Sequence, residues 1–283
     1  MTRISTSASQ TTLVSIGLAL LSGTAFGQTT LERIRAQGFI RVGFANEAPF
    51  GYATPDGHLT GVAPEVAKAV LARMGIPEVD GVLTEFGSLI PGLQAGRFDI
   101  IAAGMFITPR RCEQIAFSEP SYGIGQALLV KAGNPKRLSD YASVAADPGI
   151  RLAVMAGAAE RDYARLAGVP DAQLMVLPDQ SSLLAAVQTG RADAAALSAL
   201  SVADMVAKGR GVEKTKPFGE VAGQSVKSHG GFGFRKEDAA LRDAFNQELK
   251  AFLGTPEHLA LVDPFGFGAD YLPNRTTDEL CSE

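Results

Sequence analysis

The sequence of 283 residues has no tryptophan, only two cysteines and only three histidines. The histidines, His58, His229 and His258, are isolated and lack the spacing of metal ligands, so we expect no metal site. Lysine and arginine are scattered and the formal net charge is −4, so we do not expect nucleic acid or an anionic membrane as a partner. The sequence also shows no Ser-His-Asp set and no phosphate loop, so we expect a protein that is not an enzyme and needs no cofactor.

The two cysteines, Cys112 and Cys281, are far apart in the chain. An oxidising compartment would permit a disulfide between them. Geometry decides whether one forms, and the sequence leaves both possibilities open.

The N-terminus has the pattern of a secretory signal peptide. Arg3 precedes the apolar stretch 12–21, and Ala25-Phe26-Gly27 is a small-x-small site, which predicts a signal peptide at residues 1–27 that is cleaved after Gly27. A membrane anchor is the alternative, but the apolar stretch is short for a bilayer. No cysteine stands at the cleavage site to carry a lipid. We therefore expect a periplasmic protein, secreted across the inner membrane.

The first hundred residues after this segment alternate between strand and helix patterns. A short helix is predicted at 30–37, ending at Gly38, followed by strands at 39–44, 79–86 and 98–103 and helices at 62–74 and 88–95. The last of these strands is apolar without polar alternation, which is typical of a parallel sheet covered on both faces. Such alternation predicts a doubly wound α/β domain.

The pattern recurs in the second half, with strands predicted at 150–155, 174–177 and 192–197 and helices at 158–166 and 181–189. LIPGLQAGRFDIIAA at 89–103 matches LLAAVQTGRADAAAL at 183–197, although α/β units can also look alike without being related. Either interpretation predicts two α/β lobes. Ligands bind beyond the carboxyl ends of such strands, so we expect one site in the cleft between the lobes.

Several segments, in this order and spacing, resemble those of a known family. They are LERIRAQG at 31–38, RVGF at 41–44, PFGY at 49–52, LIPGLQAGRFD at 89–99, GMFITPRR at 104–111, FSEP at 117–120 and GFGFRK at 231–236. The chain resembles the type II periplasmic solute-binding proteins that serve polar amino acid ABC importers. The resemblance implies a monomer that delivers its ligand to a membrane permease. It also implies a lobe 1 of residues 28–124 and 231–283 and a lobe 2 of residues 125–230, with a two-strand hinge that crosses near 125–130 and 228–234.

Arg111 is the first candidate for ligand binding. The resemblance implies that the arginine of this motif grips the ligand carboxylate, and a planar guanidinium suits such a two-bond contact. The alternative is an ordinary surface arginine. In the family, the strand-to-helix turn of lobe 2, here Gly157, Ala158 and Ala159, offers backbone N–H groups to the same carboxylate, although it is also compatible with a plain helix start.

Two positions depart from the pattern of amino acid binders. Phe106 stands where a small hydroxyl residue usually contacts the ligand, and Ser198 stands where an aspartate usually pairs with the α-ammonium. A desolvated ammonium without a counter-charge costs several kcal/mol. An ordinary α-amino acid is therefore not the ligand we expect.

Glu47, Phe50, Phe86 and Phe106 are all expected at strand ends of lobe 1, although each Phe could equally belong to the core. Aromatic faces attract a weakly hydrated cation, so with Arg111 this set predicts a zwitterion whose cation is flat or alkylated. The set resembles the branch of the family that binds the compatible solutes ectoine and hydroxyectoine by hinge closure. The alternatives are another zwitterion, such as a modified amino acid, a betaine or an opine, or a periplasmic dehydratase of the same fold.

Overall fold

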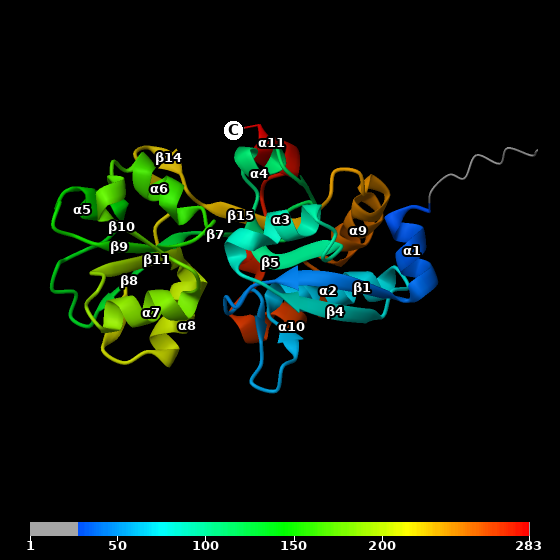
Figure 1. The fold of residues 1–283 in the computed structure, drawn as a ribbon, viewed down its shortest axis with the longest axis horizontal. Coiled ribbons are helices and arrows are strands. Elements are labelled where there is room, and N and C mark those ends of the chain that lie inside the picture. Colours follow the sequence, from blue (N-terminus) through cyan, green and yellow to red (C-terminus); the bar gives the residue numbers. More distant parts are fainter. Residues whose placement is uncertain (1–27, 283) are drawn as a thin grey trace, which may run out of the picture.

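The structure is a computed structural model that describes residues 28–282, so the predicted signal peptide lies outside the described residues. Two α/β lobes lie side by side, each with its own central sheet and helices on both faces (Figure 1). This arrangement confirms the predicted fold class. Among residues 28–282, no helix has the length and apolar character needed to cross a bilayer.

Lobe 1 is built on a sheet with the strand order β4-β1-β5-β15-β6, and β7 also pairs with β15. Strands β1, β4 and β5 run parallel, whereas β15 runs antiparallel to β5, β6 and β7. The strands are β1 (Phe39–Phe44), β4 (Glu78–Leu83), β5 (Ile100–Phe106), β6 (Ala116–Phe117), β7 (Tyr122–Ile124) and β15 (Ser228–Phe234), beside the hairpin β2 (Tyr52–Ala53) and β3 (Leu59–Thr60). The helices are α1 (Thr30–Gln37), α2 (Val62–Arg73), α3 (Leu89–Gln94), α4 (Pro109–Cys112), α9 (Ala239–Phe252), α10 (Pro256–Val262) and α11 (Thr277–Cys281).

Lobe 2 is built on a sheet with the strand order β10-β9-β11-β8-β12. The strands are β8 (Gln126–Lys131), β9 (Leu152–Met155), β10 (Leu174–Leu177), β11 (Ala194–Ser198) and β12 (Val212–Lys214), beside the pair β13 (Glu220–Val221) and β14 (Gln224–Ser225). The helices are α5 (Tyr141–Ala145), α6 (Glu160–Leu166), α7 (Gln180–Gln188) and α8 (Ala199–Lys208). Short 3-10 turns lie at Phe86–Ser88, Asp171–Gln173, Asp263–Phe265 and Ala269–Tyr271.

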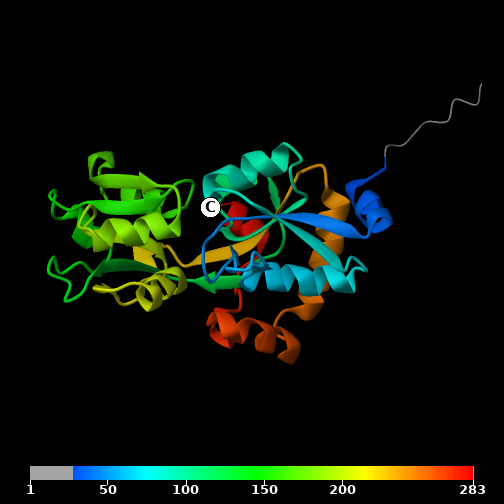
Figure 2. The same cartoon turned by 60° about the horizontal axis from the view of Figure 1, so that its bottom comes forward.

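The chain passes between the two sheets twice, along adjacent paths (Figure 2). Gly125 separates β7 in the first sheet from β8 in the second, and a Cβ at Gly125 would lie 2.8 Å from the carbonyl oxygen of Phe218. Gln126 Nε2 donates to Ser228 Oγ over 3.2 Å, which ties the outgoing path to the returning one. β8 belongs wholly to the sheet of lobe 2 and β15 wholly to the sheet of lobe 1, so the two passages lie just before these strands. The lobe boundaries at 124/125 and 230/231 stay a prediction.

Some predicted element boundaries were wrong, and the reasons are local. The strand predicted at 98–103 begins only at Ile100 and continues to Phe106, because Asp99 before it is buried and its carboxylate accepts hydrogen bonds from Arg33 and from the Arg41 N–H. The strand predicted at 79–86 ends at Leu83. Phe86 therefore does not end a strand but opens a 3-10 turn that leads into α3.

The structure joins Cys112 to Cys281 by a disulfide, with the two Cα atoms 5.7 Å apart. The bond links α4 to the C-terminal helix α11. Thr277, at the start of α11, adds hydrogen bonds to the Ser118 carbonyl and to the Glu119 carboxylate. The end of the chain is therefore fastened to lobe 1 beside the helix that carries Arg111.

Candidate functional site

A groove of about 730 Å³ lies between the lobes. Lobe 1 lines it with residues of the turn before α3, of α3 and of α4, and lobe 2 lines it with α6 and the turn before it. The segment 224–229, which returns the chain to lobe 1, forms a further part of the wall. Five of the predicted site residues line this groove: Phe86, Arg111, Gly157, Ala158 and Ala159. The other four, Glu47, Phe50, Phe106 and Ser198, are buried and are not in its lining.

Arg111 connects the two lobes. Thr108 caps α4 by accepting from the Arg111 N–H over 3.4 Å, and Pro109 begins the helix, so the backbone of Arg111 is held in place. The side chain is only 8% exposed. Its Nη1 donates to the Phe106 carbonyl over 2.7 Å and its Nη2 to the Gly157 carbonyl over 2.8 Å.

The charge of Arg111 has no close carboxylate partner. Within residues 28–282, no carboxylate oxygen lies within 4.0 Å of its guanidinium. The guanidinium carbon lies 5.6 Å from the centre of the Phe86 ring, which is within cation–π distance. Both of its hydrogen-bonded partners are neutral carbonyl groups, so a carboxylate would be a stronger partner.

Glu47 lies in the loop after β1, which the bridge between Glu47 and Gly51 closes into a tight turn. Its side chain is 7% exposed, and Oε1 accepts a hydrogen bond from Ser201 Oγ of lobe 2 over 2.8 Å. Burial, and then the charge of Glu160, raise the pKa of Glu47 to about 8, against the lowering effects of Ser201 and Arg111. A buried carboxylate with a raised pKa favours a cationic partner.

Glu160, which the sequence analysis did not include in the site, is a second buried carboxylate at the boundary. It is the first residue of α6 and is 2% exposed. Burial raises its pKa to about 7, while its own backbone N–H and the charge of Arg111 act in the opposite direction. An acidic residue in the first turn of a helix is expected from the helix dipole alone, so nothing in the sequence marked it as functional.

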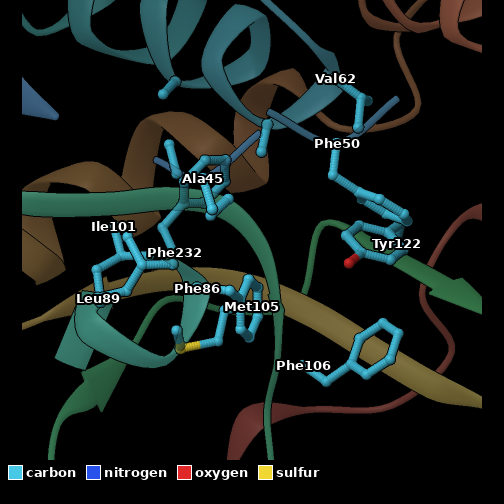
Figure 3. Close-up of a cluster of buried hydrophobic side chains, with 14 of the residues drawn as sticks. Ala45, Phe50, Val62, Phe86, Leu89, Ile101, Met105, Phe106, Tyr122 and Phe232 are labelled. Carbon is cyan, nitrogen blue, oxygen red and sulfur yellow. The ribbon is translucent and has the colours of Figure 1, made fainter. Parts of the chain in front are cut away.

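The three predicted phenylalanines divide into one core residue and a pair at the lobe boundary. Phe50 is 1% exposed and its ring packs against that of Tyr122, with the ring centres 5.2 Å apart (Figure 3). The Phe267 ring centre lies 5.6 Å away. Phe50 also covers the backbone of Gly104, where an added Cβ would lie 2.4 Å from the ring. Its packing is that of a core residue, whereas the Phe86 ring lies within cation–π distance of the Arg111 guanidinium and the Phe106 backbone carbonyl accepts a hydrogen bond from it.

Tyr122 is a further aromatic residue that the sequence analysis did not include. Its ring centre lies 6.4 Å from that of Phe106, and its hydroxyl donates to the Gly104 carbonyl over 2.7 Å. The position follows the FSEP segment by two residues, but a lone tyrosine in a short strand carries no sequence signal of its own.

Ser198 has a structural role in lobe 2. Its Oγ accepts from the Ser201 N–H over 3.2 Å, which caps α8, and donates to Ser201 Oγ over 3.1 Å. Ser198 therefore reaches Glu47 only through Ser201. In the neighbouring turn, the Ala158 N–H already donates to the Met155 carbonyl over 3.2 Å. Whether Ser198 or this turn contacts a ligand stays a prediction.

One contact between the lobes joins two glycines. Gly157 has φ +76°, and a Cβ there would lie 2.6 Å from the Gly87 Cα. Gly87 belongs to the turn before α3 in lobe 1 and Gly157 to the turn before α6 in lobe 2. The backbones of the two lobes thus meet directly at the groove.

Two α/β lobes joined by two adjacent passages, with charged side chains buried where the lobes meet, define a bilobal solute-binding protein. The chain belongs to the bacterial extracellular solute-binding proteins, family 3, whose sequence profile matches residues 40–267. Membership of this family confirms the resemblance on which the sequence analysis relied.

Individual relatives agree with the family. The "Probable amino-acid ABC transporter periplasmic-binding protein y4tE" of Sinorhizobium fredii (strain NBRC 101917 / NGR234) is 41% identical over 280 residues, which is 95% of this chain and 93% of that protein. The crystal structure of EhuB in complex with hydroxyectoine matches with a TM-score of 0.82 and 38% identity, over 89% of this chain and 97% of EhuB. The ancestral amino acid-binding protein AncCDT-1, a precursor of cyclohexadienyl dehydratase, matches with a TM-score of 0.73 and 28% identity, over 84% of this chain and 99% of its own.

Proposed function

We propose that this protein is the periplasmic solute-binding component of an ABC importer, and that it binds ectoine and hydroxyectoine by closing its lobes. In this proposal residues 1–27 direct export, and the mature monomer delivers its ligand unchanged to an inner-membrane permease. The printed names of its relatives describe a periplasmic-binding protein of an amino-acid ABC transporter and a complex with hydroxyectoine, which supports this proposal.

The observation that carries the ligand proposal is the set of ionisable groups buried at the lobe boundary. Arg111 is positive and has neutral partners, while Glu47 and Glu160 are buried carboxylates with raised pKa values. Buried charges are stable only when they are paired. A zwitterion pairs both kinds at once, with its carboxylate at Arg111 and its cation at the glutamates.

The neighbouring rings narrow the class of cation. The Phe86 ring centre lies 5.6 Å from the Arg111 guanidinium carbon. Phe106 bonds the same guanidinium through its backbone carbonyl, and its ring centre lies 6.4 Å from that of Tyr122. Aromatic faces attract weakly hydrated, delocalised cations by about 0.5–2 kcal/mol per ring. The amidinium of ectoine is such a cation, and the similarity to EhuB, which was crystallised with hydroxyectoine, supports the same choice.

Binding by lobe closure follows from the contacts that cross the boundary. The ligand would first meet Arg111 and the rings of lobe 1, and lobe 2 would then close through its contacts to Arg111 and Glu47. A ligand that binds the closed form better than the open form shifts the population by that difference in affinity. The permease would recognise the closed form.

A larger zwitterion is the second candidate, because the groove of about 730 Å³ is spacious for one small ring. Small-molecule sites of this size accept drug-sized ligands, so opines and larger modified amino acids belong to this class. A betaine, which is no larger than ectoine, is the remaining alternative zwitterion. The dehydratase alternative has weaker support, since AncCDT-1 is itself named as an amino acid-binding protein.

A thermal-shift panel tests the proposal. Ectoine, hydroxyectoine, glycine betaine, octopine, arginine and histidine would each be added to the purified protein, because a ligand stabilises by RT ln(1 + [L]/Kd). We expect the largest shift with ectoine or hydroxyectoine. A large shift with octopine and none with ectoine would show that ectoine is not the ligand. A chemical product detected by mass spectrometry after long incubation would overturn the proposal that the protein is not an enzyme.

A further inference from the structure

A second set of contacts joins the lobes outside the lining of the groove. Gln180, the first residue of α7 in lobe 2, is buried against Ala48 of lobe 1. Its Oε1 accepts from the Ala48 N–H over 2.9 Å, and its Nε2 donates to the Ala48 carbonyl over 2.9 Å. One side chain thus satisfies both backbone polar groups of a residue in the opposite lobe.

The amide of Gln180 is held in position from within lobe 2. Its Nε2 also donates to the Ser201 carbonyl over 3.1 Å, and Asp179 caps α7 by accepting from the Ser182 N–H over 2.7 Å. The side chain is therefore already oriented when lobe 1 arrives. Pre-orientation of this kind lowers the entropy lost when a contact forms.

The partner residue belongs to the loop that carries Glu47. Ala48 follows Glu47 directly, and Glu47 accepts its own hydrogen bond from Ser201. Helices α7 and α8 thus hold two consecutive residues of this loop. Neither Gln180 nor Glu47 is among the residues that line the groove, but both ends of the Gln180 amide are already bonded to backbone groups of Ala48 and Ser201.

We propose that Gln180 is a closure latch, a positioning residue that stabilises the closed arrangement of the lobes without contacting the solute. This inference rests on the lobe closure of the proposed function, but it does not depend on which solute binds. In the open protein, water would satisfy the Ala48 N–H and carbonyl. Closure without Gln180 would bury both groups unpaired, and that penalty falls on the closed form alone.

The test compares three variants with the wild type. Gln180→Ala removes the latch, and Gln180→Glu keeps its size and its acceptor but places oxygens against the carbonyls of Ala48 and Ser201. Gln188→Ala is the matched control, because Gln188 lies in the same helix, is exposed and bonds only to the Arg210 carbonyl within lobe 2. Amide exchange of Ala48 is measured with and without ectoine, and dissociation of ectoine is measured by stopped flow.

We expect faster Ala48 exchange in both Gln180 variants, with wild-type exchange in Gln188→Ala. Ectoine should dissociate about tenfold faster from Gln180→Ala, equivalent to about 1.4 kcal/mol, with little change in the association rate. Wild-type exchange and dissociation in both Gln180 variants would overturn the latch. Faster exchange in a protein to which ectoine does not bind would uphold the latch and overturn only the proposed ligand.

Discussion

Arg111 in lobe 1 donates to the carbonyl oxygen of Gly157 in lobe 2 over 2.8 Å, so the predicted anchor for the ligand carboxylate is also a contact between the lobes. The same guanidinium donates to the Phe106 carbonyl, which orients it from its own side. A group with both functions couples ligand binding to closure, because each event favours the position that the other requires.

Replacement of Arg111 by alanine should weaken ectoine binding by at least about 2 kcal/mol, or roughly 30-fold in Kd, because the ligand carboxylate would be buried without a partner. Isothermal titration calorimetry measures the change. The control is Arg110→Ala, since the Arg110 side chain is 79% exposed and lies 3.9 Å from Asp162 at closest. Equal affinity in Arg111→Ala and Arg110→Ala would remove Arg111 from the site.

Phe106→Ala should weaken binding by about 1–3 kcal/mol, since it removes both ring area and attraction for the cation. Phe106→Leu separates these effects because leucine keeps most of the apolar area and loses the aromatic face. We expect Phe106→Leu to bind with an affinity between those of the wild type and Phe106→Ala. If leucine restored full affinity, the ring would act only by apolar contact and the case for a delocalised cation would fail.

The buried glutamates predict a pH dependence of stability. In the closed protein the pKa of Glu47 is raised to about 8 and that of Glu160 to about 7, from 4.5 for an ordinary glutamate. Between pH 4.5 and 8 the folded protein therefore holds protons that the unfolded chain has released, so stability falls as the pH rises through this window. Below pH 4.5 both carboxyls are protonated in the folded and in the unfolded chain, so they no longer make the stability depend on pH.

Thermal unfolding of the ligand-free protein between pH 5 and 8, approximate limits set by this linkage, measures the effect. Glu47→Gln should flatten the decline, because glutamine does not ionise and keeps an acceptor for Ser201. Parallel curves for the wild type and Glu47→Gln would show that Glu47 does not titrate in this range. Ectoine should reverse the trend, because its cation favours the ionised carboxylates and binding then releases protons.

Reduction of the disulfide between Cys112 and Cys281 should lower the free energy of unfolding by about 2–5 kcal/mol, because the bond closes a long loop of 169 residues in the unfolded chain. Chemical denaturation with and without a reductant measures this loss. The double variant with Cys112→Ser and Cys281→Ser should match the reduced wild type and show no response to reductant. An unchanged midpoint on reduction would contradict a stabilising bond.

Local patterns made parts of the fold predictable to the residue. Helix α1 occupies 30–37 as predicted, because Thr29 and Glu32 form a capping box and Gly38 adopts the left-handed conformation that ends it. The strands at 39–44 and 174–177 also match the prediction. Strand ends such as that before Ile100 could not be predicted, since they depend on the distant partners of Asp99.

The candidate site was less predictable, because its contacts join residues far apart in the chain. The sequence pointed to Glu47 and Arg111 through motifs, but the contact of Glu47 with Ser201 spans 154 positions and that of Ala48 with Gln180 spans 132. A serine or glutamine in a helix has no feature that signals such a contact. Glu160 shows the same limit, since burial distinguishes it from any other acidic residue at a helix start.

In the proposed closure, the direct contact of Gly87 with Gly157 would limit how far the two lobes can rotate toward each other. Because two backbones in contact cannot approach further, the main chain would set the angle between the closed lobes, whatever the shape of the bound solute. A methyl group at position 157 would act as a wedge, since it would sit 2.6 Å from the opposing Cα at a φ that alanine rarely adopts. Gly157→Ala should therefore keep the lobes from closing fully. This variant can serve as a reference for the protein without the closed contacts.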